Sequence, residues 1–169
     1  MSGTSATKRA GLEGLARNLI IGWAFFGGVV LSLVVAINVI SVIGGVVWKP
    51  FPGDFEMTEI GVAVAAFAFL PYCQLVGANV TADIFTARAP HRLVAFFSLL
   101  ASLVALSFSL LLLSRMYLGM LDQKAYHYTT AILQFPHWVA FVPVLISLGL
   151  LAVAALITLL EDFNKIRKA

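Results

Sequence analysis

The sequence predicts an all-α integral membrane protein with four transmembrane helices, organised as a single membrane domain over residues 1–169. Apolar residues make up 61% of the chain and charged residues only 11%, whereas about a quarter of an ordinary soluble domain is charged. The mean hydropathy is +0.99. So few polar residues cannot cover the surface of a soluble fold of this size. The composition therefore excludes a cytosolic enzyme and a nucleic-acid-binding module.

Four long runs without charge supply the helices. A helix needs about 20 apolar residues to cross the hydrocarbon core of a bilayer, and each run is long enough for one crossing. The predicted helices are 18–47, 57–82, 91–115 and 137–161. Ionisable side chains at membrane depth usually mark ion or substrate pathways, and the interiors of these runs hold no Asp, Glu, Lys or Arg. The chain alone is therefore expected to be a poor solute carrier.

The first helix is preceded by residues 1–10, which are small and polar and are expected to be poorly ordered. Residues 11–17 either lie along the membrane surface or continue the helix. Asn38 is a lone strong polar group in this helix and is expected to find a hydrogen-bond partner in this chain or another. Small residues at every fourth position form a stripe that allows close helix approach: Ala24, Gly28, Ser32 and Ala36.

The second helix begins after a turn rich in proline and glycine, KPFPGDFEMTE over residues 49–59. Glu56 and Glu59 fall at or near the helix start, where the helix dipole favours negative charge. The same acids would also suit docking of a periplasmic partner, and the sequence leaves both interpretations open. Near the other end, Asn79 and Asp83 share one helix face.

Catalytic residues, metal ligands and cofactor sites are not predicted. A bis-histidine haem needs two histidines facing each other between helices. His91 is expected near one membrane surface, whereas His127 and His137 are expected near the other. Cys73 is the single cysteine and cannot form an internal disulfide. Its predicted role is packing within the second helix.

The distribution of basic residues predicts that both termini are cytoplasmic. Four crossings place the two termini and the loop between the second and third helices on one side. Eight of the eleven Lys and Arg residues fall on that side, and three fall on the other. Cytoplasmic segments are the ones that carry the excess of Lys and Arg.

The stretch from Lys49 to Arg92 resembles the small membrane subunit of tripartite ATP-independent periplasmic (TRAP) transporters, the DctQ-like family. That family is similar in length and helix number, with a Pro/Gly loop followed by Glu and a Gly-x-(His or Asn)-hydrophobic-x-x-Asp pattern closing the second helix. The matching positions here are Glu56, Gly77, Asn79 and Asp83. The Arg that many relatives carry near the outer end of the first helix is absent from SVIGG at residues 41–45.

The resemblance implies a non-enzymatic subunit of a sodium-driven system for organic acid uptake across the bacterial inner membrane. It implies two protein partners, a large membrane subunit that moves the solute and a periplasmic solute-binding protein. The small subunit would scaffold the large one in contact with membrane lipid. Structural or partner-contact roles are expected for seven residues: Asn38, Glu56, Glu59, Gly77, Asn79, Asp83 and Arg88.

Two other functions remain open from the residues alone. Four helices and three histidines are compatible with the membrane anchor of a redox enzyme. The small-residue stripes are compatible with an autonomous transporter that works as a homo-oligomer.

Overall fold

The computed structural model describes residues 3–77 and 91–168. Within these ranges the chain forms four α-helices and no β-sheet: α1 (Gly3–Val47), α2 (Asp54–Leu75), α4 (His91–Ala125) and α5 (His137–Lys168). All four are long and apolar enough to cross a membrane. The prediction of an all-α protein with four transmembrane helices is therefore confirmed.

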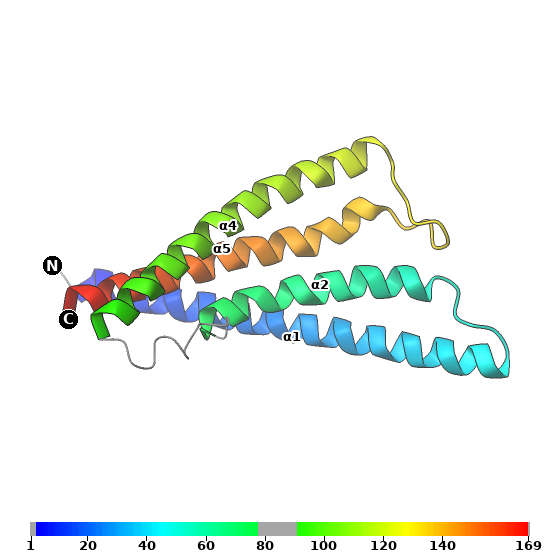
Figure 1. The fold of residues 1–169 in the computed structure, drawn as a ribbon, viewed down its shortest axis with the longest axis horizontal. Coiled ribbons are helices and arrows are strands. Elements are labelled where there is room, and N and C mark those ends of the chain that lie inside the picture. The colour runs from blue at the N-terminus through cyan, green and yellow to red at the C-terminus, as the bar shows by residue number, and fades with distance from the viewer. Residues whose placement is uncertain (1–2, 78–90, 169) are drawn as a thin grey trace.

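The helices pack side by side in an open layer rather than in a closed bundle. Figure 1 looks down the shortest axis of the molecule and shows the order α1, α2, α5, α4 across the layer. The main contacts follow this order, α1 with α2, α2 with α5 and α5 with α4, and a smaller contact joins α1 to α5. The layer therefore consists of two hairpins, α1–α2 and α4–α5, that meet along a seam between α2 and α5.

Both chain ends lie at one end of the layer (Figure 1). We call this the terminal end, and we call the opposite end, which carries the α1–α2 and α4–α5 loops, the loop end. The loops join antiparallel neighbours, so residues far apart in sequence meet at each end.

Five helix ends differ from the predicted ones. α2 begins at Asp54 rather than at residue 57, and α5 ends at Lys168 rather than at residue 161. α1 begins at Gly3 and is continuous through residues 11–17, so this segment continues the helix rather than lying along the membrane surface. α2 ends at Leu75 rather than at residue 82, because Gly77 adopts a left-handed conformation with φ +66°, which is a common way for a helix to end. α4 continues ten residues beyond Arg115, through a segment rich in good helix formers.

Small residues allow α1 and α2 to pack closely. A Cβ atom placed on Gly27 would lie 2.8 Å from the Cβ of Ala68, and one placed on Gly61 would collide with Val34. Gly28, in the stripe singled out from the sequence, has no neighbour within 4 Å of such an atom. The contact between α1 and α2 thus uses the helix face next to the predicted stripe.

Most large apolar side chains on the outside of the layer are exposed, whereas the buried core is small. Val35, Val39 and Val42 on α1 are 51–68% exposed, and Phe108 and Leu111 on α4 are 60% and 55% exposed. Contiguous apolar surface of this extent is not stable against water. It is suited to lipid or to another membrane protein. The buried apolar residues are Ile20, Val34, Val64, Ala65, Ala68, Val144, Leu148, Ala154, Ala155 and Ile157.

Candidate functional site: polar contacts along the seam between the hairpins

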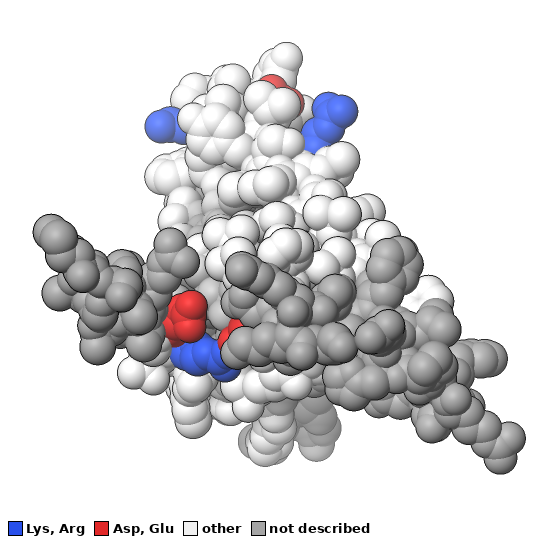
Figure 2. All heavy atoms as spheres, turned by 90° about the vertical axis from the view of Figure 1, so that its left-hand side faces the viewer, with Lys and Arg blue, Asp and Glu red and all other residues white. Residues whose placement is uncertain are grey.

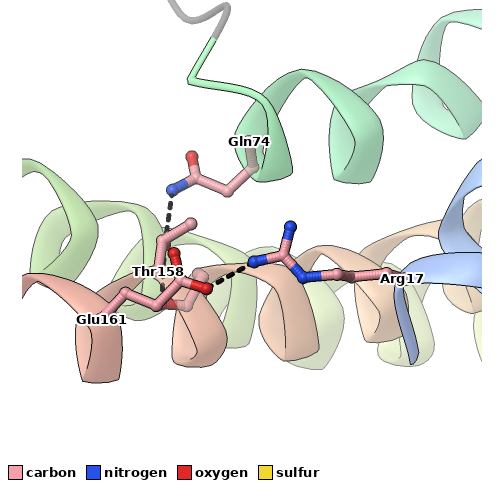
Figure 3. A network of polar contacts seen from close by, with 5 residues as sticks. Arg17, Gln74, Thr158 and Glu161 are labelled. Atoms are coloured by element: carbon pink, nitrogen blue, oxygen red, sulfur yellow. Dashed lines mark hydrogen bonds and ion pairs between the residues drawn. The ribbon is translucent and has the colours of Figure 1, made fainter. Parts of the chain in front are cut away.

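At the terminal end, two polar contacts tie the first hairpin to α5. The Arg17 guanidinium on α1 pairs with the Glu161 carboxylate on α5. The Gln74 amide, in the last turn of α2, donates to Thr158 Oγ1 at 3.1 Å. Figure 3 shows the side chains from α1 and α2 converging on neighbouring turns of α5. Because the side chains of Arg17 and Glu161 are 40% and 42% exposed, their pairing contributes at most ~1 kcal/mol and mainly fixes position.

A buried carboxylate ties α4 to α5 at the same end. Asp162 is 6% exposed, and its Oδ2 accepts hydrogen bonds from Ser98 Oγ at 2.7 Å and Ser102 Oγ at 3.1 Å. A buried carboxylate without hydrogen-bond donors would lower the stability of the fold. Asp162 therefore holds the register of α4 against α5.

A groove of about 670 Å³ lies between the ends of α2 and α5 and the first turns of α4. Figure 2 looks at the terminal end and shows acidic and basic side chains side by side among the described residues there. The polar side chains that line the groove are Gln74, Ser98, Ser102, Thr158, Glu161 and Asp162.

Midway along the layer, one hydrogen bond joins α1 directly to α5. Trp23 Nε1 donates to Ser147 Oγ at 2.8 Å. The Ser147 hydroxyl in turn donates to the Pro143 carbonyl one turn earlier. Ser147 is 1% exposed, so this contact lies within the packed interior of the seam.

Asn38 satisfies its polar group inside the first hairpin. Its Nδ2 donates to Thr58 Oγ1 on α2 at 2.7 Å and to the Val34 carbonyl at 2.9 Å. Thr58 Oγ1 donates to the Asp54 carbonyl at 2.7 Å. The expected partner of Asn38 therefore comes from this chain.

At the loop end, Asp54 closes the α1–α2 turn. The Ser41 hydroxyl on α1 donates to Asp54 Oδ2 and accepts from the Phe51 N–H. Asp54 Oδ1 accepts the Phe55 N–H at 2.7 Å. An acid in the first turn of α2 is therefore held by the preceding helix as well as by the backbone.

Glu56 bonds across the seam. Its two carboxylate oxygens accept the backbone N–H groups of Ile132 at 2.8 Å and of Leu133 at 3.0 Å, both in the α4–α5 loop. Glu59, one turn further along α2, is exposed. Among the described residues no hydrogen bond or ion pair to the Glu59 carboxylate is found, although both acids line a crevice of about 240 Å³ between α2, α4 and α5.

The structure describes four of the seven residues expected to have structural or partner roles. It places Asn38 in the α1–α2 contact, Glu56 and Glu59 beside the loop-end crevice, and Gly77 at the end of α2. Asn79, Asp83 and Arg88 lie outside the described residues.

Sequence reasoning missed most of the polar contacts between helices. Their common signal is a hydrogen-bonding side chain inside or bordering an otherwise apolar run, which needs a partner at membrane depth. The missed residues are Arg17, Trp23, Ser41, Gln74, Ser98, Ser102, Ser147, Thr158, Glu161 and Asp162.

The described part of the chain was also searched for side chains that could together bind a metal ion. No group of three or more His, Cys, Asp or Glu side chains that could hold a metal ion is found there. Cys73 is a half-buried free thiol in α2. The polar contacts described above join one helix to another, or a loop to a helix, and so hold the fold together.

Comparison with known proteins identifies the family. A family model described as "Tripartite ATP-independent periplasmic transporters, DctQ component" matches residues 31–165. Searches of curated proteins and of solved structures give no match. The family match runs from the middle of α1 almost to the end of α5 and so spans both hairpins and most of the seam. The chain therefore belongs to the DctQ component family of tripartite ATP-independent periplasmic transporters.

Proposed function

We propose that this chain is the small permease subunit of a sodium-driven transporter in the bacterial inner membrane. It forms a single membrane domain that packs against the large transport subunit and enlarges its stationary frame. The large subunit takes up an organic acid that a periplasmic binding protein delivers. Membership of the DctQ component family supports the subunit role.

The observation that carries the scaffold role is the open layer of helices with apolar outer faces. α4 packs mainly against α5, and α1 packs mainly against α2. Much of each edge helix is therefore left without a partner in this chain, and its apolar side chains are exposed. An open layer leaves the outer faces of both edge helices free to contact a neighbour. Such a layer is suited to widen another membrane protein.

The absence of charge inside the four runs argues against transport by this chain alone. The sequence places no Asp, Glu, Lys or Arg between Asn18 and Trp48, and none in the runs 60–82, 93–114 and 125–160. Membrane proteins that move ions or charged solutes usually keep such residues along the pathway. An organic acid would thus find no counter-charge within these runs.

The proposed orientation has both termini in the cytoplasm. The two termini lie at the same end of the layer, and the sequence assigns eight of the eleven basic residues to that side of the membrane. This bias is typical of the cytoplasmic side. The loop end, with Glu56 and Glu59, would then face the periplasm.

The redox-anchor alternative gains no support from the fold. His91 begins α4 at the terminal end, whereas His127 and His137 flank the α4–α5 loop at the other end. A haem cannot bridge ligands at opposite ends of membrane-spanning helices.

Reconstitution in liposomes tests the proposal. Sodium-dependent uptake is measured in three preparations. The first holds the large subunit, the binding protein and this chain, the second lacks this chain, and the third holds this chain alone. We expect uptake with all components, strongly reduced uptake without this chain, and none with this chain alone. Sodium-dependent uptake by the isolated chain would show that it is a carrier and not a scaffold.

A further inference from the structure

The α4–α5 loop, residues 126–136, is folded on itself, and we call it the strap. Thr129 and Pro136 form an isolated antiparallel bridge at its base. The Thr130 N–H donates to the Phe135 carbonyl at 3.0 Å, and the Phe135 N–H donates to Thr130 Oγ1 at 3.0 Å. Thr130 is 6% exposed. These paired bonds give the strap a defined shape before any contact with α2.

The tip of the strap presents two backbone donors to the first hairpin. The N–H groups of Ile132 and Leu133 both point to the Glu56 carboxylate. Neither N–H takes part in the hydrogen bonds between Thr130 and Phe135 at the base of the strap. Backbone donors in or near an apolar environment need partners, and a carboxylate is a strong acceptor for neighbouring N–H groups.

A second contact places the same tip on the α1–α2 turn. Gly53 precedes α2 with φ +81°, a backbone conformation that side chains disfavour. A Cβ atom there would also lie 2.6 Å from Leu133 Cγ. The Leu133 side chain therefore rests on the backbone of the turn, directly beside the Glu56 contact. The strap thus reaches from the second hairpin to the first by one polar and one apolar contact.

Beneath the strap lies the loop-end crevice. It has a volume of about 240 Å³ and lies between α2, α4 and α5. Glu56 and Thr130 line it at the strap, and its remaining lining is mostly apolar, including Ile60, Phe67 and Phe141. The contact between Glu56 and the strap therefore forms part of the wall of this crevice.

We propose that Glu56 is a latch that holds the strap across the seam, and that release of this latch opens the loop-end crevice. The assignment differs from both roles that the sequence suggested for Glu56, a charge at a helix start and a docking group for a periplasmic partner. It concerns only contacts within this chain and does not rest on the proposed transport function. A layer latched in this way resists opening of the two hairpins about the seam.

Glu59 supplies a matched control on the same helix. It carries the same charge, lies one turn away and lines the same crevice. Its exposed carboxylate has no bond to the strap in the described part of the chain. Loss of charge at Glu59 therefore changes the electrostatics of the crevice without releasing the latch.

Two readouts on the full chain in lipid nanodiscs test the latch. The first is the labelling rate of Ala140→Cys with a water-soluble maleimide, in a background of Cys73→Ala. Ala140 is half-buried and lines the crevice. The second is the distance distribution between spin labels at Phe55 and Ala131, which are exposed on the two sides of the latch. Each readout is taken with native Glu56, Glu56→Ala, Glu56→Gln and Glu59→Gln.

We expect Glu56→Ala to speed labelling several-fold and to broaden the distance distribution. Glu56→Gln keeps one acceptor oxygen and should fall between native and alanine, whereas Glu59→Gln should match native. If Glu56→Ala fails to fold, Glu56→Gln provides the decisive comparison with Glu59→Gln. Native labelling and a native distance distribution in folded Glu56 variants would overturn the latch. Equal acceleration by Glu59→Gln would also overturn it, because loss of charge would then be the cause.

Discussion

Gly27 and its neighbour Gly28 allow the packing of α1 on α2 to be tested with one matched pair of substitutions. Gly27→Ala would place a methyl group 2.8 Å from the Cβ of Ala68 and 3.4 Å from the Ala65 carbonyl oxygen. Carbon atoms pack best at about 3.5–4.0 Å, so the overlap with Ala68 is about 0.7–1.2 Å. Neither neighbouring atom lies at the end of a flexible side chain. The two helices must therefore move apart. Gly28→Ala meets no atom within 4 Å.

The expected magnitudes follow from two terms. Replacing glycine by alanine inside a helix is favourable by about 1 kcal/mol, and this gain is the same at both positions. Overpacking of a tight contact costs about 1–3 kcal/mol, and this cost falls on Gly27 alone. Gly27→Ala should therefore be less stable than Gly28→Ala by about 1–3 kcal/mol, because the first term cancels. Adding Ala68→Gly to Gly27→Ala removes the colliding methyl and should recover most of the difference.

The assay is reversible unfolding of the purified chain in mild detergent by added SDS, followed by tryptophan fluorescence. Equal stability of the Gly27→Ala and Gly28→Ala variants would refute the packing of α1 on α2 through Gly27. Failure of Ala68→Gly to rescue Gly27→Ala would show that the cost arises elsewhere.

Three further substitutions probe the polar contacts, with unfolding measured in the same way. Thr58→Val keeps the side-chain shape but removes the acceptor for Asn38, and should cost about 0.6 kcal/mol and at most ~1.7; no loss would show that Asn38 gains nothing from α2. Asp162→Ala leaves two serine hydroxyls without their acceptor and should cost about 1–3 kcal/mol, whereas Asp162→Asn should retain most of the stability; equal losses would mean that charge matters more than the hydrogen bonds. Trp23→Phe removes a donor to Ser147 and should cost about 0.6 kcal/mol, with a loss above ~2 kcal/mol contradicting a single bond of this kind.

The number and type of the helices could be predicted because a bilayer makes one strong demand on the chain. Every backbone polar group in hydrocarbon must be satisfied within the structure, so a long uncharged run forms a helix. The same principle predicted that Asn38 would find a partner. It could not identify Thr58, because spacing along the chain carries no information on which helix lies beside which.

The packing faces were harder to predict. Gly27 and Gly28 are equally small, yet adjacent positions on a helix point about 100° apart. Only Gly27 faces a close neighbour on α2. The order of helices in the layer depends on many weak contacts of this kind, and no single residue encodes it.

The loop-end contact of Glu56 was beyond sequence reasoning for a different reason. Its partners lie 76 and 77 residues away in the chain. They are backbone N–H groups, which every residue except proline possesses. The sequence therefore shows an acid near a helix start but gives no sign of the donors it binds.

The end of α2 was also predicted wrongly, since Gly77 stops the helix although the apolar run continues.

The most direct test of the central claim is to purify the tagged full-length chain from its native host in mild detergent and to determine its partners by native mass spectrometry. We predict one larger polytopic membrane protein bound near one to one, as expected of a small subunit that frames a transport subunit. Recovery of the chain alone, as a monomer or as a homo-oligomer, under conditions that preserve other membrane complexes of the host would contradict the scaffold function.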